Sequence, residues 1–131
     1  MIVADASAVV DLIADIGRKN PLRDRLSGAR LVAPDFLPIE VASALRSLNL
    51  EAILTDSHLD EAVRLLRRLR VDLQESLPLV PRVLALRDNF SAYDASYVAL
   101  AESFGCPLLT YDRRLAKAAA KHCAVELVPV P

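Results

Sequence analysis

The apolar residues of the chain follow two alternating patterns, one typical of strands and the other of helices. Short β-rich runs stop at a polar residue or a proline, and between them apolar side chains recur every three or four positions. The first pattern predicts strands at residues 1–4, 29–33, 71–74, 107–110 and 124–128. The second predicts helices at residues 6–16, 21–26, 36–48, 56–70, 78–89, 91–104 and 113–122, with Asp35 as the cap of the third. Strands that alternate with helices indicate a three-layer α/β/α sandwich around a mostly parallel sheet of about five strands.

The composition is that of an ordinary globular domain. Hydrophobic residues make up 53% of the 131 positions and charged residues 25%, without a linker or an internal repeat, so we expect one domain over residues 1–131. Asp5 interrupts the opening apolar run, and no run approaches the ~20 residues of a membrane span. We therefore expect a soluble, cytoplasmic protein with no membrane partner. The formal net charge of −1 argues neither for nor against a nucleic-acid partner.

Three aspartates fall where an α/β sheet places its chemistry. Open parallel sheets bind ligands outside the carboxyl ends of their strands. Asp5 follows the first predicted strand, Asp112 lies just past the strand that ends near Thr110, and Asp94 opens the helix before that strand. Taken singly, each is better explained as a helix cap, and Ser91 with Asp94 has the spacing of a capping box.

Glu40 shifts this balance toward a shared site. We expect it inside a helix, past the first turn, where no cap explains it, and no Lys or Arg lies three or four residues away. A tertiary salt bridge is one alternative, and a metal ion shared with the three aspartates is the other. Carboxylates alone favour Mg²⁺ or Mn²⁺, and such a site hydrolyses phosphodiester bonds by activating a water molecule. The sequence leaves open which acid would accept the proton.

Other chemistries fit the residues less well. A metal-free ribonuclease would need acid–base groups such as histidines, but His58 and His122 lie away from the acids in the sequence. An aspartyl-phosphate enzyme of the haloacid-dehalogenase type would have an aspartate where Ser7 stands. The three glycines are isolated, so there is no phosphate-binding loop.

Four motifs in order resemble those of the PIN-domain ribonucleases, and within them the VapC-type toxins of bacterial and archaeal toxin–antitoxin pairs. The motifs are Asp5-Ala6-Ser7, Glu40 in the helix after Pro34-Asp35, Tyr93-Asp94-Ala95-Ser96-Tyr97-Val98-Ala99-Leu100-Ala101, and Thr110-Tyr111-Asp112. The resemblance spans nearly the whole chain and implies a PIN-like fold. It also implies that the four acids bind the metal, while the Ser7 and Thr110 hydroxyls hold the acids or a water molecule. Local roles, in a helix turn for Ser7 and at a strand end for Thr110, are the alternatives.

The resemblance also implies partners that the residues alone do not. The first is a single-stranded or looped RNA, often tRNA or ribosomal RNA, which is cut to leave a 5′-phosphate and a 3′-hydroxyl. The second is another copy of the chain, in a homodimer. The third is a small antitoxin that can push a basic side chain into the acidic site. A catalytically silent PIN-like binding module, or a PIN nuclease of RNA processing, are the alternative functions.

A basic stripe begins beside the last of the four acids. Arg113, Lys117 and Lys121 stand four residues apart on one predicted helix, and a second basic group occupies residues 64–68. We predict that Arg113 and Lys117 contact RNA phosphates, with an ordinary solvated helix face as the alternative.

Overall fold

The centre of the protein is a five-stranded sheet in which every pair of neighbouring strands is parallel. The structure is a computed structural model that describes residues 1–14 and 20–128. The strands are β1 (Ile2–Ala4), β2 (Leu31–Pro34), β3 (Val71–Gln74), β4 (Leu108–Thr110) and β5 (Val125–Leu127). Their order in the sheet is β3-β2-β1-β4-β5, so β1 lies between β2 and β4 and the carboxyl ends of β1 and β4 are neighbours.

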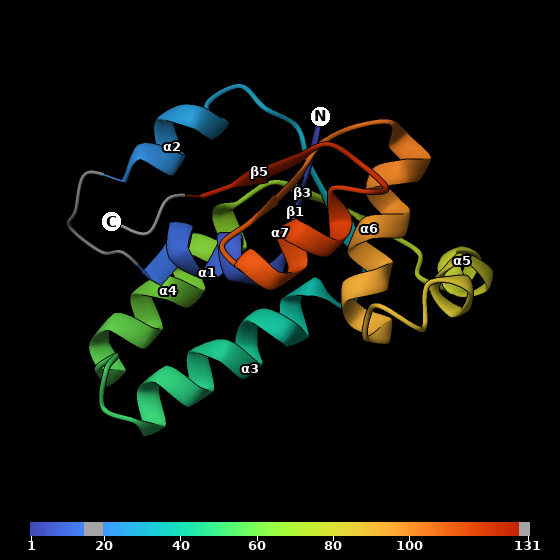
Figure 1. Cartoon of the computed structure of the whole chain (residues 1–131). Coiled ribbons are helices and arrows are strands. Elements are labelled where there is room, and N and C mark those ends of the chain that lie inside the picture. Colours follow the sequence, from blue (N-terminus) through green and yellow to red (C-terminus); the bar gives the residue numbers. More distant parts are fainter. Residues whose placement is uncertain (15–19, 129–131) are drawn as a thin grey trace.

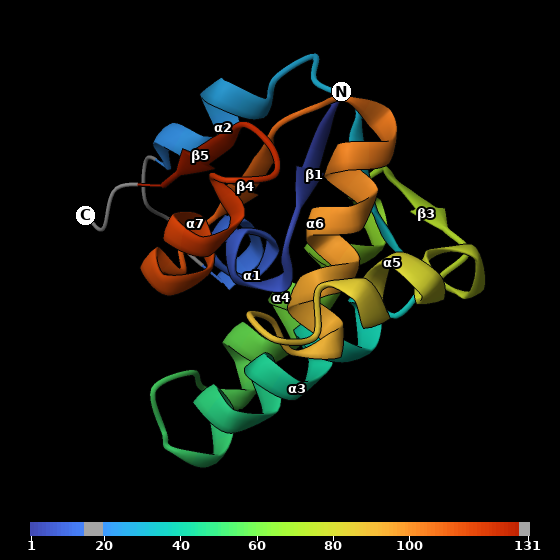
Figure 2. The ribbon, with the colours of Figure 1, turned by 45° about the vertical axis from the view of Figure 1, so that its right-hand side comes forward.

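Helices cover both faces of this sheet. They are α1 (Ala6–Ala14), α2 (Pro21–Leu26), α3 (Leu37–Leu50), α4 (Asp56–Arg68), α5 (Val80–Ala85), α6 (Ala92–Phe104) and α7 (Arg113–Ala119), with a short 3-10 helix η1 (Leu77–Leu79) before α5. α6 packs across β1 and β2 with α5 against it, whereas α1 packs with α3 and α4 (Figures 1 and 2). The predicted α/β sandwich with a parallel central sheet is confirmed. None of the helices in the described ranges is long and apolar enough to cross a membrane.

The core lies between the sheet and α6 and between the sheet and α1. Every residue of β1, β2 and β4 is buried, as expected for parallel strands that are covered on both faces. α6 is buried without interruption from Ala95 to Ala101, which explains why its sequence is apolar on almost every side. Its left-handed end at Gly105, with φ of 60°, is the conformation that a glycine adopts most easily.

The predicted cap of α3 is wrong. Asp35 does not cap α3, because its backbone N–H donates to the carbonyl of Gln74 at 2.8 Å and extends the pairing of β2 with β3 by one residue. Its carboxylate accepts instead from the backbone N–H of Ser76 at 3.3 Å. The N-cap is Phe36, which forms no side-chain capping bond. α3 therefore starts at Leu37 and places Glu40 in its first turn, not past it as predicted.

Several other boundaries differ from the prediction. The segment predicted as one helix at residues 78–89 is η1 followed by α5, in which Pro78 and Pro81 each occupy an opening position. α7 ends at Ala119 and is followed by a turn up to residue 123. The last two residues of the predicted helix 6–16 lie outside the described residues.

Candidate metal centre

Asp5 is the most buried of the four predicted acids. It directly follows β1 and its side chain is only 6% exposed. One carboxylate oxygen, Oδ1, accepts from the Ser7 hydroxyl at 2.6 Å and from the Ala8 N–H at 3.0 Å, and Oδ2 accepts from the Thr110 hydroxyl at 2.5 Å. Burial raises the pKa of Asp5, the three hydrogen bonds oppose this effect, and the nearby charge of Asp112 adds to it. Asp5 therefore supports the first turn of α1 and also carries a poorly solvated charge.

The hydroxyls of Ser7 and Thr110 join Asp5 to the segment that follows β4. Besides donating to Asp5, the Thr110 oxygen accepts from the Asp112 N–H at 3.0 Å, and the Ser7 oxygen accepts from the Tyr111 N–H at 3.0 Å. The two hydroxyl oxygens are 3.3 Å apart. Thr110 is fully buried, so its hydroxyl has no water with which to exchange these partners. This network fixes the position of Asp5 relative to the backbone of Asp112.

Asp112 caps α7 with only one of its oxygens. Oδ1 accepts from the backbone N–H groups of Arg114 and Leu115, at 2.9 and 3.1 Å. Within the described part of the chain, Oδ2 accepts no hydrogen bond from a protein group. The capping interpretation of Asp112 is therefore correct, and it leaves one carboxylate oxygen for a ligand.

Asp94 is not a cap, although it lies in the first turn of α6. Ser91 is the N-cap, and its hydroxyl accepts from the Asp94 N–H at 3.1 Å. Burial raises the pKa of Asp94, and the charges of Asp112 and Asp5 raise it further, against a hydrogen bond with Ser91. The carboxylate of Asp94 is thus held among other negative charges.

Glu40 reaches the same region from α3. Its Oε1 accepts from the phenol of Tyr97 at 2.7 Å, and among the residues that the structure describes it forms no salt bridge. Burial raises the pKa of Glu40, the Tyr97 bond opposes the shift, and the charges of Asp94 and Asp5 add to it. The tertiary salt bridge that was the alternative for Glu40 is therefore not found in the described structure.

Tyr97 is a site residue that the sequence reasoning missed. It lies on α6 three residues after Asp94, so both side chains are on one helix face, and its side chain is 1% exposed. The ring of Phe36 contacts the rings of Tyr97 and Tyr93 edge to face, with centroid distances of 5.7 and 5.2 Å. These contacts fasten the beginning of α3 to the beginning of α6. Burial and the bond to Glu40 raise the pKa of Tyr97 well above its usual range, so the phenol stays protonated and donates.

The four carboxylates form a site whose chemistry suits a hard divalent cation. They come from the ends of β1 and β4 and the first turns of α3 and α6, and each of the three shifted pKa values includes repulsion from another member. Oxygen donors of this kind are those that Mg²⁺ and Mn²⁺ prefer. Among residues 1–14 and 20–128, no three His, Cys, Asp or Glu side chains are close enough to hold an ion by themselves. An ion held here would therefore keep part of its water shell, as Mg²⁺ does in most protein sites.

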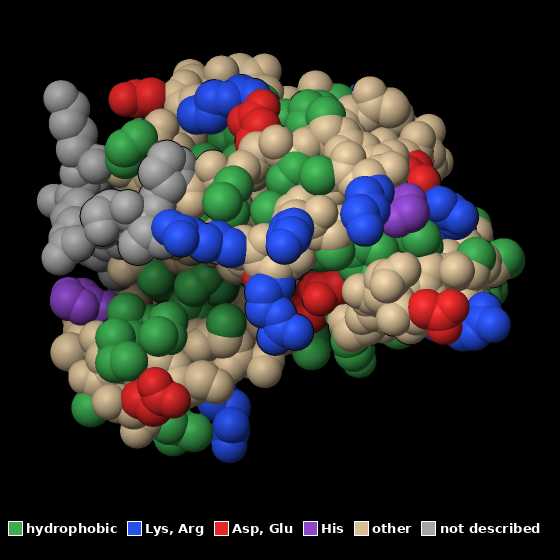
Figure 3. Space-filling model, in the orientation of Figure 1, with side chains coloured by type: hydrophobic (Ala, Val, Ile, Leu, Met, Phe, Trp, Pro, Cys, Tyr) green, Lys and Arg blue, Asp and Glu red, His purple; other side chains and the backbone are tan. Residues whose placement is uncertain are grey.

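Basic residues of α7 lie near the acids, but the arginine that lines the cavity beside them is not the one that was predicted. Arg113 and Lys117 lie exposed on α7. Figure 3 shows Lys and Arg side chains gathered over α7, and acidic side chains between α7 and α3. A cavity of about 410 Å³ beside Asp94 and Asp112 is lined by Arg114 and not by Arg113. The sequence spacing did not distinguish these two neighbours.

The chain is similar to known proteins over most of its length. The PIN domain model matches residues 2–121 of the chain. Ribonuclease VapC9 of Mycobacterium tuberculosis is 38% identical over 129 residues, which cover 98% of this chain and 99% of the relative. Ribonuclease VapC3 of the same organism is 39% identical over 118 residues, with coverage of 89% and 86%. The crystal structure of PAE2754 from Pyrobaculum aerophilum superposes with a TM-score of 0.67 at 26% identity and covers 95% of this chain and 87% of that one.

The fold, the sheet order and the matched model define a PIN domain. Within that class, identity over almost the whole of both chains shows that the protein belongs to the VapC ribonucleases.

Proposed function

We propose that the chain is a Mg²⁺- or Mn²⁺-dependent endoribonuclease that hydrolyses RNA phosphodiester bonds in the cytoplasm as the toxin of a toxin–antitoxin pair. One observation supports the proposed metal dependence. The pKa values of Asp5, Glu40 and Asp94 are each raised in part by the charge of at least one other of the four acids, yet no cationic side chain in the described part of the chain pairs with them or with Asp112. Such a concentration of charge is costly unless a cation balances it. The names of the VapC relatives support RNA as the substrate.

The residues of the proposed site have different roles. Asp5, Glu40, Asp94 and Asp112 would hold the ion directly or through its water molecules, and the ion would supply Lewis acidity toward a water molecule and a phosphoryl oxygen. Ser7 and Thr110 orient Asp5 through their hydrogen bonds, and Tyr97 orients Glu40. Asp112 is fixed by the backbone bonds it accepts at the start of α7. We place all of these functions in one nuclease domain, residues 1–131.

The proposed partners follow from membership of the VapC group. They are an RNA such as tRNA or ribosomal RNA, a small antitoxin whose basic side chain would enter the acidic site, and a second copy of the chain. A homodimer is supported by exposed apolar side chains on α3 and on η1, α5 and α6, of which the last three pack against one another: Ile39, Leu77, Leu84 and Tyr93 are 74%, 78%, 56% and 57% exposed. An apolar surface of this kind is typical of a protein contact. Sedimentation analysis of the chain alone would show whether it dimerises.

The decisive experiment is RNA cleavage by the wild-type chain, by Asp5→Asn and by Asp94→Asn, with and without EDTA. We expect cleavage by the wild type in Mg²⁺ or Mn²⁺, its loss in EDTA, its recovery when metal is restored, and no cleavage by either variant. Asp88→Asn is the matched control, because Asp88 is an exposed aspartate in the turn before α6. Cleavage that survives both site substitutions would falsify the assignment, and no cleavage by the wild type under any metal would favour a silent binding module.

A further inference from the structure

A cavity beside the acidic site has a composition that suits a nucleotide. Its volume is about 410 Å³, within the range of about 300–1,000 Å³ that is common for small-molecule sites. Asp94 and Asp112 line one part of it, and Asn89, Phe90 and Ser91 come from the segment that leads into α6. Arg114 reaches it from the first turn of α7. Carboxylates, an amide, a hydroxyl, an aromatic ring and a guanidinium therefore face one hollow.

Arg114 differs from four other arginines of the protein in its side-chain interactions. Arg25, Arg30, Arg64 and Arg82 each form an ion pair with a carboxylate. In the described part of the chain, the side chain of Arg114 forms neither an ion pair nor a hydrogen bond, although two carboxylates line the same cavity. Its backbone N–H is bound to Asp112 at 2.9 Å, which fixes where the side chain starts. The guanidinium is therefore positioned by its backbone and free to bind an external anion.

The chemistry of the cavity identifies that anion. A guanidinium presents planar paired donors that match the oxygens of a phosphate. The amide of Asn89 offers donors and an acceptor that suit the edge of a base, and among the described residues no protein group occupies them. Arg114 lines the same cavity as two of the four acids that would hold the metal ion. A free phosphate would use the guanidinium but would leave the remainder of the cavity empty.

We propose that this cavity is a subsite for one nucleotide of the RNA, in which Arg114 binds the phosphate next to the one that is cut. The proposal rests on the ribonuclease function proposed above. Because the contact is made to a neighbouring phosphate, it is already present when the RNA binds, and its loss raises KM more than it lowers kcat. A lost charge-assisted hydrogen bond of about 1.5–3 kcal/mol corresponds to a change of roughly 10- to 100-fold.

Arg114 should favour RNA binding but disfavour metal binding. Its positive charge opposes the accumulation of cations at Asp94 and Asp112, which line the same cavity. Neutralising it should therefore weaken RNA binding and strengthen Mg²⁺ binding. A variant that is damaged in its fold would weaken both, so the two measurements together separate a phosphate contact from a structural role.

The test compares Arg114→Gln with Arg67→Gln, because Arg67 is an exposed arginine on α4 that does not line this cavity. The substrate is a short fluorescent single-stranded RNA at fixed ionic strength, and Mg²⁺ binding is followed by the thermal shift. We expect Arg114→Gln to raise KM by about 10-fold or more with kcat within about 3-fold, and to shift Mg²⁺ binding to lower concentration. Arg67→Gln should match the wild type in every measurement.

A second variant keeps the proposal testable if Arg114→Gln does not fold. Asn89→Ala removes a cavity side chain that precedes α6, and we expect it to raise KM by a few-fold with Mg²⁺ binding unchanged. Values of KM equal to the wild type in each folded variant of this pair would overturn the subsite. That result requires an active wild type, whereas a wild type that cleaves no RNA would instead overturn the proposed function.

Discussion

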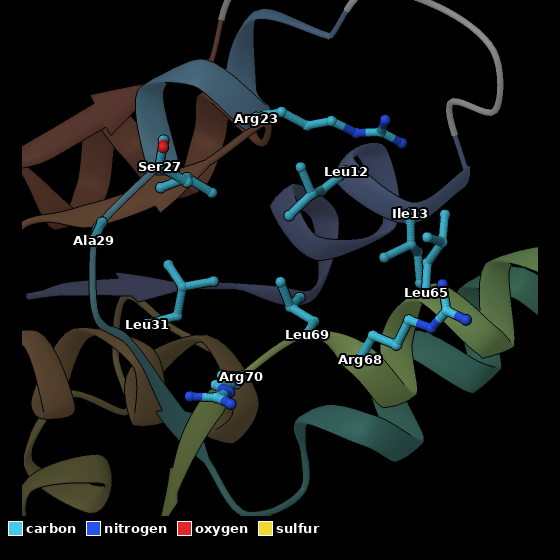
Figure 4. Close-up of a pocket in the computed structure, with 11 residues that line it drawn as sticks. Leu12, Ile13, Arg23, Ser27, Ala29, Leu31, Leu65, Arg68, Leu69 and Arg70 are labelled. Carbon is cyan, nitrogen blue, oxygen red and sulfur yellow. The ribbon is translucent and has the colours of Figure 1, made fainter.

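Two cavities of the same volume, about 410 Å³ each, differ in almost everything except size. One lies beside Asp94 and Asp112, and most of its lining residues are polar or charged, with Phe90, Leu115 and Ala118 as the apolar ones. The other lies between α1, α2, the end of α4 and β2, and apolar side chains such as Leu12, Leu31 and Leu69 form its walls (Figure 4). Its charged members are Arg23 of α2, Arg68 at the end of α4 and Arg70 two residues further along the chain. Volume alone therefore does not identify the site of chemistry.

The two linings differ in how they affect the stability of the folded chain. Packing leucines around a hollow requires no compensating charge. Carboxylates held near one another, away from water, are repelled by their neighbours and disfavoured by desolvation, and three of the four acids show this in a raised pKa. A fold that keeps such an arrangement loses stability there in exchange for a binding site. Substitution of the acids and of the side chains around the two cavities tests this distinction.

Asp94→Asn should abolish activity and stabilise the metal-free protein. Removing one metal-binding carboxylate should reduce RNA cleavage on the order of 100-fold or more. The same change removes a charge that Asp112 and Asp5 repel, so the melting temperature in EDTA should rise. The stabilisation of the variant by Mg²⁺ should be smaller than that of the wild type. Kinetic assays and thermal melts in EDTA and in Mg²⁺ measure these effects.

Asp88→Asn should change neither activity nor stability, because that side chain is exposed and outside the site. A melting temperature of Asp94→Asn below that of the wild type in EDTA would contradict the view that repulsion dominates at this carboxylate.

Tyr97→Phe should reduce cleavage about 10-fold by releasing Glu40. The substitution keeps the ring that Phe36 contacts and removes only the hydroxyl that donates to Glu40 at 2.7 Å. Activity should therefore need more Mg²⁺ for half-saturation while the melting temperature in EDTA changes little. Tyr93→Phe is the control, because Tyr93 contacts the same Phe36 ring but is 57% exposed. Equal metal dependence in the two variants would mean that Tyr97 only fills the core.

Much of this arrangement could be predicted from local sequence. The strands, α4 and α6 follow from apolar periodicity and from capping residues such as Thr55, Ser91 and Gly105, whose roles depend on their nearest neighbours in the chain. The start of α3 could not be predicted in this way. It depends on the pairing of Asp35 with Gln74, a residue in a strand 39 positions later whose place in the sheet is a tertiary property.

The positions of the acids and the supporting hydroxyls of Ser7 and Thr110 were predictable, but the support from Tyr97 was not. Asp5, Asp94 and Asp112 stand at strand and helix ends, where the chain itself reveals their positions, and Thr110 ends a strand. Tyr97 belongs to the motif around Asp94, but the sequence assigned it no role, because it does not show that Glu40 of α3 lies opposite its hydroxyl. Arg113 and Arg114 both lie in the first turn of α7, on different faces of the helix. The sequence does not show which face lines the cavity, because that depends on how α7 packs against the rest of the fold.

The pH dependence of stability should have the sign expected for destabilised carboxylates. In metal-free protein the pKa values of Asp5, Glu40 and Asp94 lie above those of the unfolded chain, so at intermediate pH the folded state binds more protons. The contribution of these acids to the free energy of unfolding should fall as pH rises from the unfolded pKa through the folded pKa.

Urea unfolding in EDTA between about pH 4 and pH 8 measures this contribution as the difference between the wild type and Glu40→Gln. The advantage of the variant should grow with pH and disappear at the acidic end. An advantage that is constant across the range would mean that charge at Glu40 is not its origin.

The double variant Arg113→Gln, Lys117→Gln should weaken RNA binding mainly through its salt dependence. Each phosphate contact that is lost should reduce the slope of log K against log salt by about 0.7 for a single strand. Binding is measured by fluorescence anisotropy in an Asp94→Asn background, in which the RNA is not cut. An unchanged slope, equal to that of Arg67→Gln in the same background, would leave both side chains on an ordinary solvated face of α7.

The smallest effect should come from the apolar cavity. Arg68→Gln removes one positive charge at the apolar cavity, and Arg114→Gln removes one beside the acids. A comparison of the two variants therefore separates the effect of where the charge lies from the effect of losing a charge. Arg68 stands at the end of α4 among leucines of α1 and β2, and none of the four acids lines that cavity. We expect its KM for RNA and its Mg²⁺ affinity to stay within about 2-fold of the wild type. If Arg68→Gln instead raised KM as much as Arg114→Gln, the RNA would be responding to the total positive charge of the surface. The lining of each cavity would then no longer explain where the substrate binds.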